Sequence, residues 1–180
     1  MESNESDCLT EQHLALFGAI IHWYARHEVL MQQIMAVVSG ADITSIRLLT
    51  DDLTFGEKRH TLFRLLRHRA IPLDRIDEIQ NYLRILHTFT PLRNDIAHSA
   101  WTEGKPANLI SPAWLTHGPI RAVQADHGGD PAGAEPFANY EEQVAFTLEN
   151  LQGTVDNLKT NYARFLAFAK TADLVPANNP

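Results

Sequence analysis

The residues best suited to chemistry lie close together near the end of a predicted helix, in the segment Arg93-Asn94-Asp95-Ile96-Ala97-His98. At 100° per residue, Asn94 and His98 share one helix face a turn apart, and Arg93 flanks them. His87 lies further back on the same line. Arginine grips phosphate through two parallel hydrogen bonds, and histidine transfers protons near neutral pH. Such a pair is suited to cutting a phosphodiester without a metal ion.

A structural interpretation of the same residues is also open. Arginine and histidine near a helix C-terminus stabilise the helix dipole and pair with carboxylates. Arg93 continues an apolar stripe, so its guanidinium needs a partner or a cleft, because an unpaired buried charge is very costly. Glu28, which interrupts the apolar stripe of the first helix, is the predicted supporting partner of Arg93. The alternatives for Glu28 are pairing with Arg26 or Arg47, or partial exposure at an interface.

The elements that position these residues are predicted to be helices. Apolar residues recur at helical spacing over 10–39, 42–50, 54–70, 73–100 and 139–170. Thr10 caps the first helix and Gly40 ends it, while Asn139 with Glu142 resembles a capping box for the last one. A seven-residue repeat in the last helix suits a partner in a bundle or an interface between subunits.

Proline and glycine mark the interruptions. Pro91 predicts a kink over residues 87–91, immediately before the motif. The segment 102–138 is rich in glycine and proline, which forbids a long helix there. Within it, residues 109–115 and 120–123 are predicted to pair as a small β-hairpin.

Two further groups of side chains could contact RNA. Trp101 and Trp114 could stack on bases, or Trp101 could pack the segment 102–138 onto the helices. A basic helix face is suited to an RNA backbone, although such faces are also commonly solvated beside acidic neighbours. The candidate RNA-binding residues on this face are Lys58, Arg59, Arg64 and Arg67.

Composition bounds the class of protein. The 180 residues, 44% of them hydrophobic and 21% charged, suit one globular domain over 10–170, with loose tails at 1–9 and 171–180. The net charge of −7 argues against a surface that binds nucleic acid indiscriminately. A lone cysteine, Cys8, and the lack of a signal or apolar span predict a cytoplasmic protein without a membrane partner.

Metal and cofactor sites are not predicted. Glu57-x-x-His60 has the spacing of a di-iron ligand pair, but the chain has no second such pair and no HExxH motif. Glycine-rich phosphate-binding loops are absent as well. We therefore expect any catalysis to rest on side chains alone.

The motif Arg93-Asn94-Asp95-Ile96-Ala97-His98 resembles the R-x4-6-H motif of HEPN domains (higher eukaryotes and prokaryotes nucleotide-binding). In that family a polar residue, often asparagine, follows the arginine, as Asn94 does here. The resemblance covers the helical scaffold over about residues 10–100 and 139–170, and only the six-residue motif is specific. It implies an all-α bundle, and with the helices predicted above we expect four to five helices. The small β-hairpin insert before the last helix is predicted from the residues alone and has no assignment from this resemblance.

The resemblance also implies an activity. Many HEPN proteins are metal-independent endoribonucleases that form homodimers, in which two motifs face each other. Arg93 would then hold and neutralise the scissile phosphate, Asn94 would orient the phosphate or Arg93, and His98 would assist proton transfer at the 2′-hydroxyl or the leaving oxygen. Cleavage would leave a 2′,3′-cyclic phosphate and a 5′-hydroxyl, in a toxin–antitoxin or phage-defence setting, with an antitoxin or nucleotidyltransferase as a partner protein. The alternatives are a non-catalytic HEPN module that binds a protein or nucleotide, and a purely structural dimeric bundle.

Overall fold

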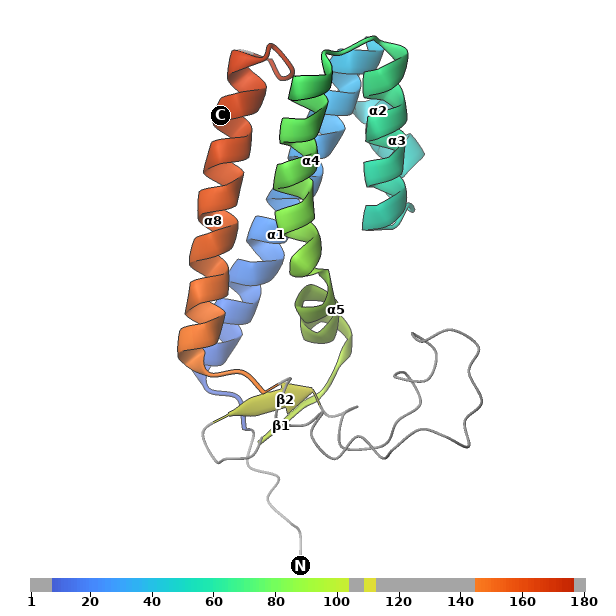
Figure 1. Ribbon diagram of the computed structural model, residues 1–180. Helices are drawn as coiled ribbons and strands as arrows, with labels where there is room; N and C mark the ends of the chain where they lie inside the picture. Colours follow the sequence, from blue (N-terminus) through green and yellow to red (C-terminus); the bar gives the residue numbers. More distant parts are fainter. Residues whose placement is uncertain (1–7, 104–108, 113–144, 177–180) are drawn as a thin grey trace, which may run out of the picture.

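The computed structural model describes residues 8–103, 109–112 and 145–176. Helices dominate it, and a small sheet lies at one end of the bundle (Figure 1). In chain order the elements are α1 (Glu11–Ser39), α2 (Ile43–Thr50), α3 (Phe55–His68), α4 (Leu73–Thr88), α5 (Thr90–His98), β1 (Trp101–Glu103), β2 (Ile110–Pro112) and α8 (Leu148–Thr171). The predicted all-α bundle with a small β element before the last helix is confirmed.

The first helix begins and ends where the sequence predicts. The Thr10 hydroxyl accepts a hydrogen bond from the backbone N–H of His13, and the His13 ring returns to the Thr10 backbone, which completes a capping box. Gly40 ends α1 in the left-handed conformation, with φ at 76°, which a residue without Cβ adopts at little cost.

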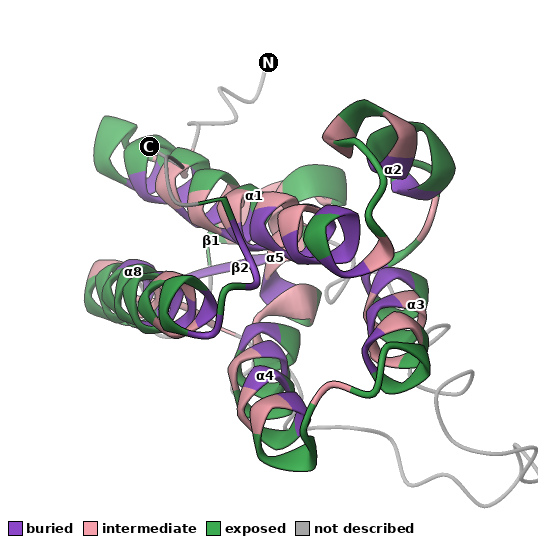
Figure 2. Cartoon of the chain, turned by 90° about the horizontal axis from the view of Figure 1, so that it is seen from above, coloured by how far each residue is buried: buried purple, intermediate pink, exposed green. Residues whose placement is uncertain are grey.

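Helix α1 lies at the centre of the fold. Its most extensive contact is with α8, and it also contacts α2, α3 and α5. Seen from above, the buried sides of α1, α3, α4 and α8 face one another across the core (Figure 2). Fully buried side chains there include Ile20, Leu62, Leu83 and Phe165, one from each of these four helices. The wide apolar face of α1 therefore serves several neighbours, as two adjacent stripes require.

The predicted long fourth helix is broken into α4 and α5. Phe89 closes α4 with its N–H on the carbonyls of His87 and Leu86, and α5 starts again at Thr90. Pro91 lies in the first turn of α5, where its missing N–H costs no helical hydrogen bond. The prediction of an interruption over 87–91 is correct, and the break turns α5 away from the axis of α4 (Figure 1).

The last helix begins later than predicted. The sequence placed its start at Asn139, whereas α8 starts at Leu148 and residues 145–147 are not helical. Thr147 caps α8, and its hydroxyl accepts from the N–H of Asn150, 3.0 Å away. Phe146 instead exchanges backbone hydrogen bonds with Ile110, and this bridge takes its backbone away from helical geometry. Residue 139 itself lies outside the described residues.

The small sheet differs from the predicted hairpin. Residues 110–112 form a strand, as expected, but they pair antiparallel with 101–103, in the register Thr102 opposite Ser111. The predicted second strand, 120–123, lies outside the described residues. The strand β1 follows α5 after two residues, so the sheet closes the end of the bundle directly after the motif.

Two predicted tails are partly packed. Cys8 is half-buried and its thiol donates to the carbonyl of Trp101, 3.2 Å away. Beyond α8, Leu174 and Val175 are only 3% and 6% exposed, and Arg75 donates to the Ala172 carbonyl at 3.1 Å. The expectation of a loose end after Lys170 is therefore wrong for residues 172–175, because apolar side chains there complete the core.

Among the described residues, no single helix is long and apolar enough to cross a membrane; the bent pair α1 and α2, which meet at 120°, reaches that length and composition only together.

Candidate functional site

The short helix α5 presents the motif at the edge of the core. Leu92 is buried and anchors the helix, while Arg93 is half-buried and Asn94 and His98 are exposed. The Arg93 guanidinium lies over the ring of Tyr24 at 5.8 Å and donates to the Asn94 side-chain oxygen at 3.1 Å. A cation over an aromatic face is attracted by the ring quadrupole, so both contacts hold the guanidinium without neutralising it.

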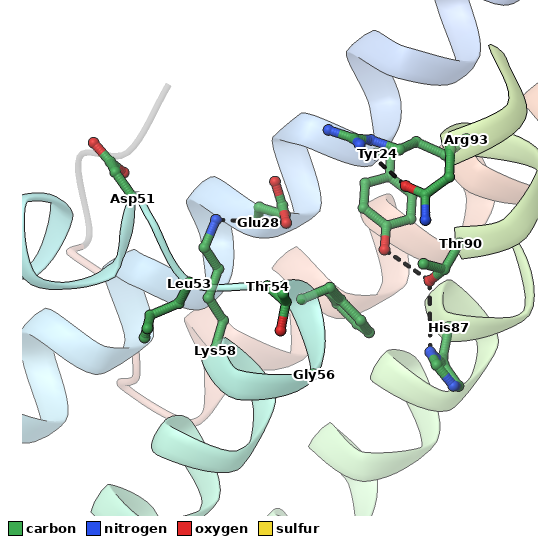
Figure 3. Close-up of a pocket in the computed structure, with 12 residues that line it drawn as sticks. Tyr24, Glu28, Asp51, Leu53, Thr54, Gly56, Lys58, His87, Thr90 and Arg93 are labelled. Atoms are coloured by element: carbon green, nitrogen blue, oxygen red, sulfur yellow. Dashed lines mark hydrogen bonds and ion pairs between the residues drawn. The ribbon is translucent and has the colours of Figure 1, made fainter. Parts of the chain in front are cut away.

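A cavity of about 400 Å³ lies beside Arg93 (Figure 3). It is bounded by α1, by the turn that leads from α2 into α3, by the start of α3, and by the junction of α4 with α5. The lining residues are Tyr24, Glu28, Asp51, Leu53, Thr54, Phe55, Gly56, Lys58, His87, Thr90, Arg93 and Asn94. Eight of these twelve residues carry a charged, hydroxyl or amide group, so the lining is polar as well as apolar.

A chain of hydrogen-bonding groups crosses the α4–α5 junction. The Tyr24 hydroxyl lies 2.9 Å from the Thr90 hydroxyl, which lies 3.5 Å from Nδ1 of His87. Burial raises the pKa of Tyr24 to about 12; Glu28 adds to the rise, while Thr90 and Arg93 oppose it. Tyr24 therefore remains protonated at neutral pH and can donate a hydrogen bond. The ring of Phe55 stacks on His87 at 5.9 Å and supports this wall of the cavity.

The predicted pairing of Glu28 with Arg93 is wrong. Glu28 instead forms an ion pair with Lys58, with 3.6 Å between carboxylate oxygen and ammonium nitrogen, and the two side chains are 21% and 9% exposed. The predicted alternative through Arg26 is wrong too, because Arg26 lies over the rings of Trp23 and Tyr162. The first turn of α3 carries Lys58 inward against α1, where a carboxylate in an otherwise apolar stripe meets it.

The predicted basic face of α3 does not include Lys58 in the structure. Lys58 is buried, so it does not share an outer surface with the other candidates. Arg59 is half-buried, and Arg64 and Arg67 are exposed on the same helix. None of these three arginines lines the cavity. A separate solvent-facing strip thus remains for Arg64 and Arg67, distinct from the Arg93 site.

The motif is divided by the tertiary structure. Arg93 and Asn94 line the cavity, whereas His98, the last residue of α5, does not. The imidazole that shares the cavity with Arg93 is that of His87. The sequence placed His87 on the line of Asn94 and His98, but it contained no signal that Tyr24 and Thr90 would line the site.

Charge is distributed unevenly across the cavity. Among the described residues, no carboxylate lies within salt-bridge distance of the Arg93 guanidinium. In the view of Figure 3, Asp51 lies on the side opposite Arg93, with Glu28 and Lys58 between them. Asp51 accepts a hydrogen bond from the Gln32 amide at 3.1 Å. Counting only the described residues, the cavity therefore has a cation without a carboxylate partner at one side and acceptor oxygens toward the other.

Trp101 packs within the fold. Its ring lies 4.6 Å from that of Phe17 and 6.0 Å from that of Phe146, which joins β1 to α1 and to the strand-like segment before α8. These contacts agree with the packing interpretation of this tryptophan. Trp114 lies outside the described residues. Over the described ranges, no three His, Cys, Asp or Glu side chains gather in a way that could hold a metal ion.

Comparisons of the chain with models of protein families, with curated proteins and with solved structures find no match.

Proposed function

We propose that the chain is a HEPN-type, metal-independent endoribonuclease whose active site contains Arg93, Asn94 and His98. The observation that carries the proposal is the state of Arg93. Its guanidinium lines a partly polar cavity with an aromatic ring and an amide as partners and, within the part of the chain that the structure describes, with no carboxylate to neutralise it. A cation kept free in this way is suited to a phosphate, which it can grip through two hydrogen bonds.

The reaction needs only groups that the motif supplies. The 2′-hydroxyl of the RNA attacks the adjacent phosphorus, a new P–O2′ bond forms and the P–O5′ bond breaks. The products are a 2′,3′-cyclic phosphate and a 5′-hydroxyl, so one proton leaves the 2′-oxygen and one reaches the 5′-oxygen. Arg93 stabilises the charge that develops on the phosphoryl oxygens, and His98 transfers a proton at one of the two oxygens. Asn94 holds Arg93 in position through their hydrogen bond.

The position of His98 makes a second copy part of the proposal. His98 is exposed at the end of α5 and lies outside the cavity that Arg93 lines. In a homodimer that places two α5 helices face to face, His98 of one protomer can serve the phosphate bound by Arg93 of its partner. The setting we propose is a toxin–antitoxin or phage-defence system, with an antitoxin or nucleotidyltransferase as the partner protein.

The decisive test is cleavage of single-stranded RNA by the purified full chain in EDTA. We expect cyclic phosphate ends from the unmodified chain, and a loss of at least about 100-fold in Arg93→Ala and His98→Ala, given the usual size of acid–base and electrostatic contributions. Arg84→Ala, which removes an exposed arginine of α4 outside the cavity, is the matched control and should cleave normally. Cleavage that survives in both motif variants would rule out the proposed site.

Mixing the two inactive variants tests the shared site. An Arg93→Ala protomer retains His98, and a His98→Ala protomer retains Arg93, so a hybrid dimer restores one complete pair across the interface. We expect the mixture to regain cleavage that neither variant has alone. A mixture that exchanges subunits and stays inactive contradicts the shared site.

One observation favours the second candidate, a non-catalytic HEPN module. The cavity holds Arg93 and Asn94 without His98, which is a sufficient arrangement for binding a phosphate without cutting it. Under this alternative Arg93→Ala abolishes ligand binding, His98→Ala has no effect, and the unmodified chain cleaves no RNA.

A further inference from the structure

The cavity beside Arg93 carries a recognition pattern that the motif does not explain. Its volume of about 400 Å³ lies in the range of small-ligand sites, which runs from about 300 to 1,000 Å³. Arg93 offers positive charge at one side, and Glu28 and Asp51 offer carboxylate oxygens away from it (Figure 3). A matching ligand is anionic at one end and rich in hydrogen-bond donors at the other. A nucleotide with a donor-bearing base has this character.

The ion pair of Glu28 with Lys58 narrows the choice of base. Its carboxylate and ammonium lie 3.6 Å apart and both residues line the cavity, so an acceptor stands directly beside a donor. The ammonium of Lys58 has three N–H donors and the carboxylate has several lone pairs, which leaves both able to bind a ligand. Guanine presents the complementary edge, a carbonyl oxygen next to two adjacent N–H donors.

Uracil fits this pair less well than guanine does. Uracil places a carbonyl oxygen on each side of a single N–H, so one of its oxygens would face a carboxylate. Asp51 strengthens the preference for guanine over uracil, since it adds a second carboxylate to the side of the cavity that accepts hydrogen bonds from the base. Its hydrogen bond from Gln32 occupies only part of its accepting capacity.

We propose that this cavity is a subsite that favours guanine over uracil, in which the Glu28–Lys58 pair and Asp51 read the base and Arg93 binds the attached phosphate. The identification of that phosphate as the scissile one rests on the proposed ribonuclease activity, whereas binding of the nucleotide does not depend on that activity. In an RNA strand, the subsite would direct the motif to phosphates next to an unpaired guanine, because single-stranded bases are free to enter pockets with their Watson–Crick edges.

The test is titration of the full chain with guanosine and uridine monophosphates, each as the 3′ and the 5′ isomer, by isothermal calorimetry. We expect one guanosine isomer to bind at least about tenfold more tightly than the matching uridine isomer, which is the size expected of a good paired contact to a base. Arg93→Ala should weaken both nucleotides by about tenfold or more, because both carry the phosphate.

Variants of Glu28 and Asp51 test base recognition without removing the side chain. Glu28→Gln keeps an oxygen for Lys58 but replaces one acceptor by a donor, so it should abolish the preference for guanosine while uridine binding persists. Asp51→Asn, at an exposed position, should reduce the preference several-fold, and its neighbour Asp52→Asn, which does not line the cavity, should leave it unchanged.

Equal binding of the two nucleotides, absence of binding, or a preference that survives in folded Glu28→Gln would overturn the subsite. The two proposals fail separately. His98→Ala should retain the preference for guanosine over uridine, since His98 lies outside the cavity that reads the base. A chain that prefers guanosine but cuts no RNA contradicts only the ribonuclease, and a chain that cuts RNA with no preference contradicts only the subsite.

Discussion

The charge of Arg93 is not neutralised by the neighbours that hold its guanidinium in place. Its partners are the ring of Tyr24 and the side-chain oxygen of Asn94, neither of which carries a compensating charge. Glu28, the carboxylate that we predicted as its partner, forms its ion pair with Lys58 instead. Because Lys58 pairs with Glu28, Arg93 stays half-buried at the cavity without a carboxylate partner among the described residues. The ion pair therefore influences the charge of the candidate site as well as lining it.

The Glu28–Lys58 pair can be tested by a double-mutant cycle. Lys58→Met should lower the free energy of unfolding by about 2 kcal/mol, because a largely buried carboxylate loses its cation. Adding Glu28→Gln should restore a substantial part of that loss, since no charge is then left unpaired. Urea denaturation of the two single variants and the double variant measures this coupling.

Lys159→Met, on the exposed side of α8, is the matched control and should change stability by less than about 0.5 kcal/mol. Additive effects of Lys58→Met and Glu28→Gln would show that the pair does not couple.

At the scale of elements, the interruption between α4 and α5 sets the direction of the motif. Pro91 cannot continue the hydrogen-bond ladder of α4, so the chain restarts at Thr90 with a new axis. This restart brings the Thr90 hydroxyl within 2.9 Å of the Tyr24 hydroxyl and turns Arg93 over the same ring. A continuous helix would have kept Arg93 on the apolar stripe of α4, facing the core.

The start of α8 gives a second test at this scale. Thr147 caps the helix through a reciprocal capping box with Asn150. Thr147→Ala should therefore lower the free energy of unfolding by about 1 kcal/mol, the usual cost of losing an N-cap. Chemical denaturation of the variant gives the value.

Thr160→Ala provides the comparison, because Thr160 is exposed in the interior of α8. Alanine has the higher helix propensity there, so this variant should be neutral or slightly more stable. Equal effects of the two substitutions would contradict a helix start at residue 148.

At the scale of the whole molecule, one buried polar network joins three helices. Nδ1 of His27 donates to the carbonyl of Trp23 at 2.7 Å, which leaves Nε2 as the acceptor for the Asn161 amide at 3.2 Å. The same amide donates to the carbonyl of Tyr82 at 3.2 Å, so α1, α8 and α4 share it. The network requires a neutral His27, because a proton on Nε2 would face the N–H of Asn161.

Burial lowers the pKa of His27 from 6.5 to about 4, against the opposing effect of the Trp23 carbonyl. Between these values the unfolded chain binds a proton that the folded chain does not. Stability should therefore be complete above about pH 6.5 and should fall as the pH drops toward 4. A shift of about 2.5 units corresponds to a loss of about 3 kcal/mol at about 1.4 kcal/mol per unit.

Urea denaturation at pH 7 and near pH 4.5 measures this loss, with His27→Gln as the comparison. The variant has no titrating group at this position. Between pH 7 and pH 4.5, its free energy of unfolding should therefore fall by about 2–3 kcal/mol less than that of the unmodified chain. An equal pH dependence in both proteins would show that His27 does not control acid sensitivity.

The sequence by itself determined the helical class, the caps of α1, the interruption at Pro91 and the position of the motif at the end of a helix. These features depend on local rules: apolar periodicity, capping side chains and the missing N–H of proline. Local rules misplaced the start of the last helix, because the backbone pairing of Phe146 with Ile110 joins residues 36 positions apart. The partner of the strand at 110–112 was missed for a similar reason.

The tertiary structure alone decided the content of the site. It assigned Glu28 to Lys58, placed His87 and Tyr24 beside Arg93, and left His98 outside the cavity. The physical reason is that a side chain's charge partner depends on how helices cross, and spacing along one helix does not contain this information. The motif Arg93 to His98 is therefore divided between two places. Arg93 and Asn94 line the edge of the cavity, and His98 lies at the exposed end of α5.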